Sequence, residues 1–133
     1  HWECVRDDSA AGRPGLGGYR SVNRLQEYRY GYILYNPFDI YFAVALELYG
    51  EWSQLEMEVL LALLRRGDTV VEAGVHIGTM AVGLAQHVGP AGRLVGFEPQ
   101  RVLHQLACAN VALNGLWHVT IHHAAAAAAS APA

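Results

Sequence analysis

Several features that mark other classes of protein are scarce or absent in this sequence. It has no lysine, and its nine basic residues, all arginine, are outnumbered by twelve acidic residues, for a net charge of -3. This balance gives no support for a surface that binds nucleic acid or an acidic membrane. No apolar run reaches the length of a membrane span. We therefore expect neither nucleic acid nor a membrane among its partners.

Cysteine is also rare. Cys4 lies in a polar N-terminal stretch and Cys108 lies in an apolar helical pattern, so a disulfide framework is not expected. Cys108 is predicted to be a buried, inert thiol. The chain begins at His1 and shows no secretory signal, so we expect a cytoplasmic protein, here as a fragment or a processed form.

What is present is enough apolar sequence for one folded core, because 53% of the 133 residues are hydrophobic and 16% are charged. The composition predicts a flexible tail over 1–20 and a strand and helix lead-in over 21–66. The main α/β region is predicted over 67–125. A low-complexity tail is predicted over 126–133, within the alanine-rich stretch "AAAAAASAPA".

Within the lead-in, the tyrosine-rich stretch "YRYGYILYN" predicts a strand or hairpin. Asp39 is a suitable N-cap for the helix "IYFAVALELY", which Gly50 can end. Ser53 and Glu56 have the spacing of a capping box for a second helix. The apolar stripe predicted for that helix consists of Leu55, Val59 and Leu63, widened by Leu60 and Leu64.

The main region alternates short apolar runs with helical patterns. Strands are predicted near 69–73, 93–97 and 119–122, separated by the helices "IGTMAVGLAQHV" and "QRVLHQLACANVAL". Helices of this length between strands favour parallel pairing with right-handed crossovers, in spatial order 3-2-1. The predicted fold class is therefore α/β, of the doubly wound type. Asn110 and Asn114 are expected to end the second helix and to bond its loop.

The stretch "VVEAGVHIGT" places chemistry at the end of the first strand, where open parallel sheets bind ligands. Gly74 allows a sharp turn and close approach of a ligand, and Gly78 lets the next helix approach the strand. The helix N-terminus near Ile77 suits a carboxylate or phosphate. Glu98, at the end of the second strand, can accept hydrogen bonds from a ribose diol.

Two adenosine cofactors compete for this pattern. A dinucleotide site usually carries G-x-G-x-x-G, whereas here His76 stands between Gly74 and Gly78 and would crowd a pyrophosphate. The acid Glu72 would also repel phosphates. S-adenosylmethionine instead offers an amino group and a sulfonium to an acid, a carboxylate to the helix end and a ribose to Glu98. The residues therefore favour S-adenosylmethionine over a nicotinamide dinucleotide.

Other polar residues predict less. His118, His122 and His123 cluster near the third strand, but the sequence offers no cysteine or carboxylate beside them, so we expect strand-end histidines in solvent and no metal. No Ser-His-Asp or Cys-His arrangement is readable, and the catalytic residues therefore stay unassigned.

Four blocks together resemble the FkbM family of S-adenosylmethionine-dependent methyltransferases: "NPFDIYFAVALELYGEWSQLEMEVLLALLRRGD", "VVEAGVHIG", "GRLVGFEPQ" and "LACANVALNGL". The resemblance covers about residues 35–125 and implies a partial Rossmann-like class I methyltransferase fold. It also implies O-methylation of a sugar, polyketide or other small metabolite, with a small-molecule methyl acceptor as partner. The implied cofactor contacts are Glu72, Gly74, His76, Gly78 and Glu98, with Tyr49, Glu51, Thr79 and Pro99 as further candidates.

The resemblance also implies that part of the enzyme is missing. A class I sheet has about seven strands, and the cofactor cleft lies between the first and the fourth, whereas only three are predicted here. We expect this chain by itself to bind S-adenosylmethionine weakly or not at all and to transfer no methyl group. The alternatives are a non-catalytic remnant or nucleotide-cofactor-binding module and, less favoured, an NAD-dependent oxidoreductase.

Overall fold

The computed structural model describes residues 22–127, so Cys4, the 1–20 tail and most of the 126–133 tail lie outside the described residues. The elements are β1 (Arg24–Tyr28), β2 (Gly31–Tyr35), α1 (Ile40–Tyr49), α2 (Gln54–Leu63), β3 (Thr69–Ala73), α3 (Thr79–Val88), β4 (Arg93–Phe97), α4 (Arg101–Leu113) and β5 (Val119–His122). Within 22–127 no helix is both long and apolar enough to span a membrane.

The three predicted strands of the main region form a parallel sheet in the order β3-β4-β5. Val70 lies opposite Leu94, and Leu94 lies opposite Val119. The prediction of parallel strands in the order 3-2-1 is therefore confirmed, and the fold is α/β. This arrangement arises because a helix connects each short β-branched or apolar run to the next. A helix does not fit in a hairpin turn, so consecutive strands pair in parallel.

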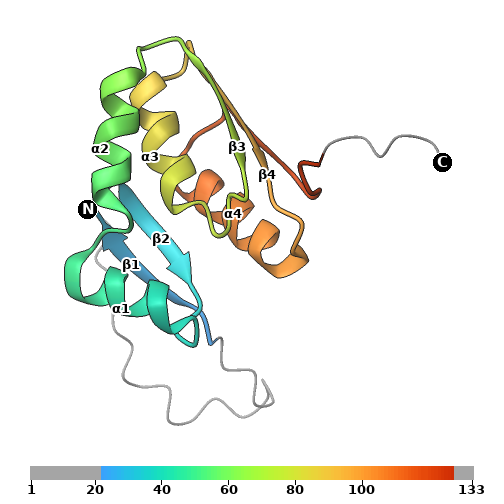
Figure 1. Cartoon of the computed structure of the whole chain (residues 1–133). Helices are drawn as coiled ribbons and strands as arrows, with labels where there is room; N and C mark the ends of the chain where they lie inside the picture. The colour runs from blue at the N-terminus through green and yellow to red at the C-terminus, as the bar shows by residue number, and fades with distance from the viewer. Residues whose placement is uncertain (1–21, 128–133) are drawn as a thin grey trace, which may run out of the picture.

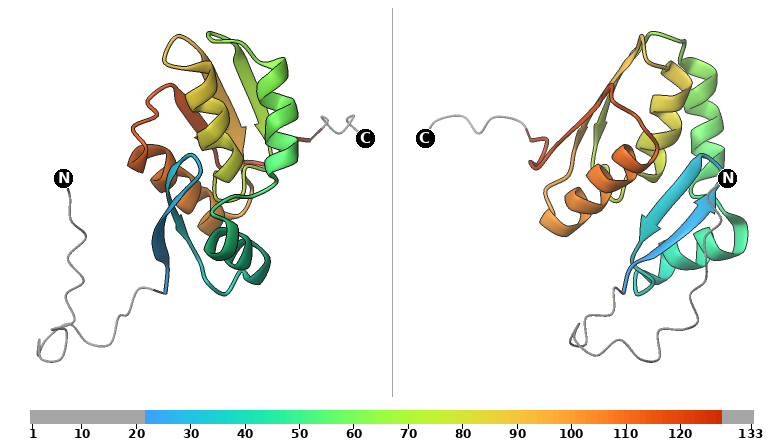
Figure 2. Two further views of the ribbon diagram at one scale, coloured as in Figure 1. Left: turned by 90° about the vertical axis from the view of Figure 1, so that its left-hand side faces the viewer. Right: turned by 180° about the vertical axis from the view of Figure 1, so that it is seen from behind.

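The helices α2, α3 and α4 lie on one face of this sheet, and the opposite face carries none of the described helices (Figures 1 and 2). The core lies between the helices and the sheet. Its most completely buried side chains here include Val82, Val88 and Leu94. On the opposite face Val71 is 68% exposed. The sheet is thus packed on one side only within residues 22–127.

In the first part of the lead-in, β1 and β2 pair as an antiparallel hairpin beside α1, and the buried residues of this unit join the same core as those of the main region. Figure 1 shows this unit at the end of the molecule toward which the carboxyl ends of β3 and β4 point. The predicted hairpin is confirmed. The lead-in therefore stands next to the loops where an open parallel sheet binds ligands.

Two asparagines of α4 bind the hairpin where a third strand would otherwise pair with it. Asn110 accepts a hydrogen bond from the Leu34 N–H (2.6 Å) and donates one to the Leu34 carbonyl (2.9 Å). One helical turn later, Asn114 makes the same pair of bonds to Tyr32, at 2.9 and 2.7 Å. Asn110 also donates to the Ile77 carbonyl at 2.8 Å and is fully buried. These bonds fasten the lead-in to the main sheet.

The predicted apolar stripe of the second helix is only partly confirmed. Leu60 and Leu64, which widen it, pack against the core, but Leu55, Val59 and Leu63 are 81%, 61% and 75% exposed, and Met57 is buried in their place. The helix is apolar on two sides, so its periodicity does not decide which side faces the sheet.

The predicted helix caps are only partly formed. Asp39 and Ser53 occupy the N-cap positions of α1 and α2, but neither side chain makes a capping hydrogen bond, so the capping box of Ser53 and Glu56 is absent. Ser53 has a left-handed backbone (φ 48), which differs from the extended N-cap geometry. Gly50 ends α1 as predicted.

Cys108 is partly exposed, where a buried thiol was predicted. Its Sγ lies 3.5 Å from His104 Nε2, and partial burial raises the pKa of the thiol. A raised pKa leaves less reactive thiolate at neutral pH, so the expectation of low reactivity stands on this ground.

Candidate functional site

In the loop between β3 and α3, every second residue from Gly74 to Gly78 has a left-handed backbone conformation. Gly74, His76 and Gly78 have φ values of 82°, 56° and 88°, all in the left-handed region. Glycine adopts this region freely, but for a histidine it costs about 1–3 kcal/mol. The Phe97 carbonyl accepts hydrogen bonds from the N–H groups of Gly74 (2.8 Å) and of the residue after it (3.1 Å). The loop is therefore anchored to the carboxyl end of β4.

Glu98 joins this loop to the start of α4. Its Oε2 accepts a hydrogen bond from the His76 N–H at 2.9 Å, and its Oε1 accepts one from the Gln100 N–H at 2.9 Å. The residue is only 4% exposed. The structure thus brings Glu98 and His76 together, as a shared site requires. A carboxylate has further lone pairs, so these two bonds leave acceptor capacity for a ribose.

Glu72 is the least satisfied polar group of the site. It comes from the end of β3, and its Oε2 is buried without a hydrogen-bond partner among the described residues. Desolvation by burial raises the pKa of its carboxyl to about 7. Residues 22–127 therefore give this carboxylate no counter-charge.

Glu72 and Gly74 also line a cavity of about 520 Å³ along the free edge of β3. Its other lining residues are apolar and come from α2, β3, α3 and the chain following α2: Leu60, Leu63, Leu64, Val70, Val71, Ala73, Met80 and Leu84. This volume lies in the range of small-molecule pockets. The cavity thus combines an apolar wall with a single carboxylate.

The remaining site candidates lie around this region without touching the Glu72 carboxylate. Tyr49 is 73% exposed, and Glu51 pairs with Arg29 at 3.0 Å; both line a shallow cavity beside the hairpin. Thr79 is buried at the start of α3, where its carbonyl accepts a hydrogen bond from a hairpin tyrosine. Pro99 is exposed.

Gly78 differs from its predicted role. It is the N-cap of α3, which begins at Thr79, two residues later than predicted. A Cβ on Gly78 would lie 3.5 Å from the Ala107 Cα, an ordinary contact, and its three nearest atoms all belong to this residue of α4. The requirement for glycine there comes from the positive φ.

Sequence reasoning did not predict the contacts that Asp39 and Phe42 make with this loop. His76 Nε2 lies 3.3 Å from Asp39 Oδ2, and the His76 ring stacks on Phe42 with centroids 4.2 Å apart. Phe42 in turn stacks on Trp52 at 3.7 Å. The aromatic residues gave only a helical and a turn pattern in the sequence, which does not identify a contact with a distant loop.

The histidines near β5 serve local bonding. His118 Nε2 lies 2.8 Å from the Ala85 carbonyl oxygen, His123 Nε2 lies 3.0 Å from the Pro99 carbonyl oxygen, and the His122 ring stacks on Phe97. Across residues 22–127 no three His, Cys, Asp or Glu side chains group closely enough to hold a metal ion.

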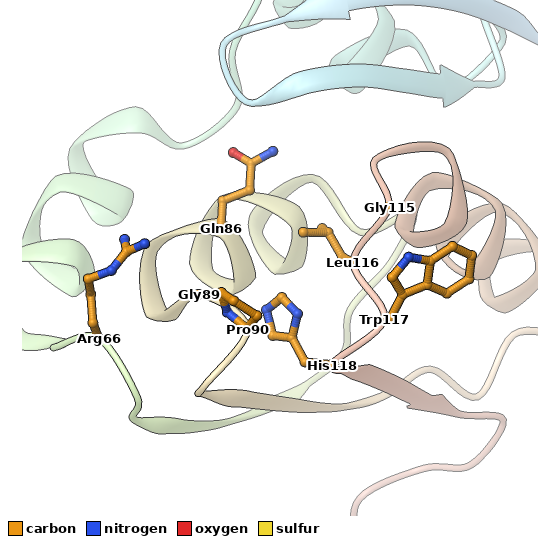
Figure 3. A pocket seen from close by; sticks show the side chains of 8 residues that line it. All are labelled: Arg66, Gln86, Gly89, Pro90, Gly115, Leu116, Trp117 and His118. Carbon is orange, nitrogen blue, oxygen red and sulfur yellow. The ribbon is translucent and has the colours of Figure 1, made fainter.

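A second cavity, of about 530 Å³, lies at the opposite end of the strands, next to the residues that precede β4 and β5 (Figure 3). The His118 ring lies next to Pro90 there, and Arg66 and Trp117 stand at its two ends. Ligands of open parallel sheets bind at the carboxyl ends of the strands, and this cavity lies at the amino ends. We therefore assign the site to the loop after β3.

Comparisons with known proteins agree with the fold. No family model matches the sequence. A 60-residue segment, 45% of the chain, is 35% identical to the catalytic subunit of a tRNA (adenine(58)-N(1))-methyltransferase from Cryptococcus neoformans. Among solved structures, the chain resembles a protein from Clostridium thermocellum assigned as an rRNA methylase, at 25% identity over 56% of the chain, with a TM-score of 0.53.

A further similar structure is a SAM-dependent O-methyltransferase from Thermotoga maritima, at 23% identity over 76% of the chain, with a TM-score of 0.52. The chain spans 14% of the tRNA methyltransferase and 41% and 40% of the two solved structures. Residues 22–127 thus have the Rossmann-like fold of S-adenosylmethionine-dependent methyltransferases, over less than half the length of these structures.

Proposed function

We propose that this chain forms the cofactor-binding part of an S-adenosylmethionine-dependent methyltransferase. The observation that carries the proposal is the buried, unpartnered Oε2 of Glu72 beside the open turn at Gly74. A carboxylate without a counter-charge suits a ligand that brings an amino group and a sulfonium. No atom lies within 4 Å of a Cβ built on Gly74, so a ligand can approach the backbone there.

The same residues fit a dinucleotide poorly. Its pyrophosphate would meet the ionised form of Glu72, and the loop lacks a glycine at position 76. S-adenosylmethionine supplies an activated methyl group for in-line displacement, for which a protein mainly aligns donor and acceptor and excludes water. The chain can therefore take part in methyl transfer without a readable catalytic motif.

The finer assignment is membership of the FkbM family, with O-methylation of a small metabolite. It is supported by the order of the four sequence blocks and by the net charge of -3, which disfavours an RNA surface. A second candidate is an RNA substrate, which the similarity to a tRNA methyltransferase favours. The acceptor-binding residues would decide between them.

The ribose role of Glu98 is testable with simple ligands. We expect the chain to bind adenosine more tightly than 2′,3′-dideoxyadenosine, because only adenosine offers a diol to Glu98. Glu98→Ala should remove this preference, which corresponds to about 1–3 kcal/mol. NMR titration of backbone amides measures both affinities.

Loss of the Glu98 carboxylate also frees the Gln100 and His76 N–H groups, so overall affinity alone would not isolate the ribose contact. The ratio between the two ligands does isolate it. An equal preference for adenosine in the wild-type chain and in Glu98→Ala would exclude the ribose role.

A further inference from the structure

His76 is held in its left-handed conformation by the lead-in. Within residues 22–127, Ser53 and His76 are the two non-glycine residues with a positive φ. The His76 ring makes two contacts with the start of α1. Its Nε2 lies 3.3 Å from the Asp39 carboxylate, and the ring stacks on the face of Phe42 with centroids 4.2 Å apart. Both come from residues that precede the loop by more than thirty positions.

The Asp39 side chain is available for this contact because it does not cap its own helix. Asp39 stands at the N-cap of α1, yet its carboxylate makes no capping hydrogen bond. An aspartate at this position would ordinarily accept bonds from the first turn of the helix. Here its Oδ2 faces His76 Nε2, and the side chains of both residues are about one-third exposed or less (35% and 27%).

The contact also fixes the ring. The 3.3 Å contact between Nε2 and Asp39 Oδ2 holds one edge of the imidazole against the start of α1. Nδ1 is buried without a partner among the described residues. The backbone N–H of the same residue points to Glu98 at 2.9 Å. Holding the ring therefore also directs this N–H toward the carboxylate of the candidate site.

We infer that His76 is a positioning residue of the cofactor loop, and that Asp39 and the Phe42–Trp52 stack control the loop through it. The lead-in thus sets the conformation of the loop from outside the main sheet. The ligand arm of this inference rests on the proposed function, whereas the structural arm does not.

The structural arm compares Asp39→Asn with the wild-type chain by amide hydrogen exchange. Asparagine is as good an N-cap as aspartate, so α1 should stay intact. We expect the His76 amide to exchange about 5-fold faster, as loss of a partly exposed contact with a carboxylate predicts, while the amides of α1 are unchanged. Unchanged exchange at His76, or faster exchange in α1 alone, would overturn the inference, because Asp39 would then act only as the N-cap residue of α1.

The ligand arm uses His76→Gly as the rescue variant, because glycine adopts the left-handed conformation without support. Asp39→Asn should weaken binding of S-adenosylmethionine about 5-fold in the wild-type background and less than 2-fold in His76→Gly, measured by NMR titration. Equal weakening in both backgrounds would contradict control through His76. If no variant of this chain binds S-adenosylmethionine, the exchange result alone decides the positioning role.

Discussion

Replacing Asn110 by leucine is expected to destabilise the protein by about 3 kcal/mol or more. The side chain is fully buried and holds three backbone groups, the N–H and carbonyl of Leu34 and the carbonyl of Ile77. Leucine has a similar volume but no polar atoms, so the buried Ile77 carbonyl and the two partly buried groups of Leu34 would lose their partner, at about 1–3 kcal/mol each. Urea unfolding followed by circular dichroism measures the change.

Asn114 provides the matched control. It makes the same pair of bonds to Tyr32, one helical turn further along α4, but these bonds are exposed. Water can replace them, so Asn114→Ala should cost only about 1 kcal/mol. If the two substitutions were equally mild, the asparagine contacts would not be what fastens the hairpin to the sheet.

Replacing Glu72 by glutamine is expected to stabilise the protein at alkaline pH and to abolish cofactor binding. Burial raises the pKa of Glu72 from 4.5 to about 7 in the folded chain. Between these values the unfolded chain has lost a proton that the folded chain retains, so stability falls as pH rises. The penalty is absent below about pH 4.5 and complete above about pH 7, where it reaches about 3 kcal/mol.

Glutamine carries no charge, so the difference in unfolding free energy between Glu72→Gln and the wild-type chain should grow by this amount from pH 4.5 to 8. Glu56→Gln, which removes an exposed carboxylate of α2, is the control for the effect of the substitution itself. A flat difference for Glu72→Gln would show that the carboxylate is not buried in solution.

The sheet could be predicted from the sequence because its determinants are local. The runs at 69–73, 93–97 and 119–122 are short, rich in apolar or β-branched residues and bounded by turn or polar residues, and helices separate them. Such patterns leave few topologies. The direction of α2 could not be predicted, because apolar residues on both sides of the helix satisfy the same periodicity.

The site could be predicted only in part. Glu72, Gly74 and Glu98 follow from their places at strand ends, which the sequence reveals. The contacts of Asp39 with His76 and of Asn110 with Leu34 join residues far apart in the chain. The local pattern predicts a cap for Asp39 and a helix end for Asn110. Each side chain instead contacts a distant element, and local rules do not describe such a choice.

The most direct test of the central claim is an NMR titration of this chain with S-adenosylmethionine, with NAD as the competing cofactor. The proposed site predicts saturable shifts of the amides of Gly74, His76 and Gln100, with a weak affinity on the order of millimolar, because the chain spans less than half the length of the similar solved structures. NAD should leave these amides unchanged. Equal shifts with NAD, or shifts centred on the cavity around Trp117, would contradict the assignment.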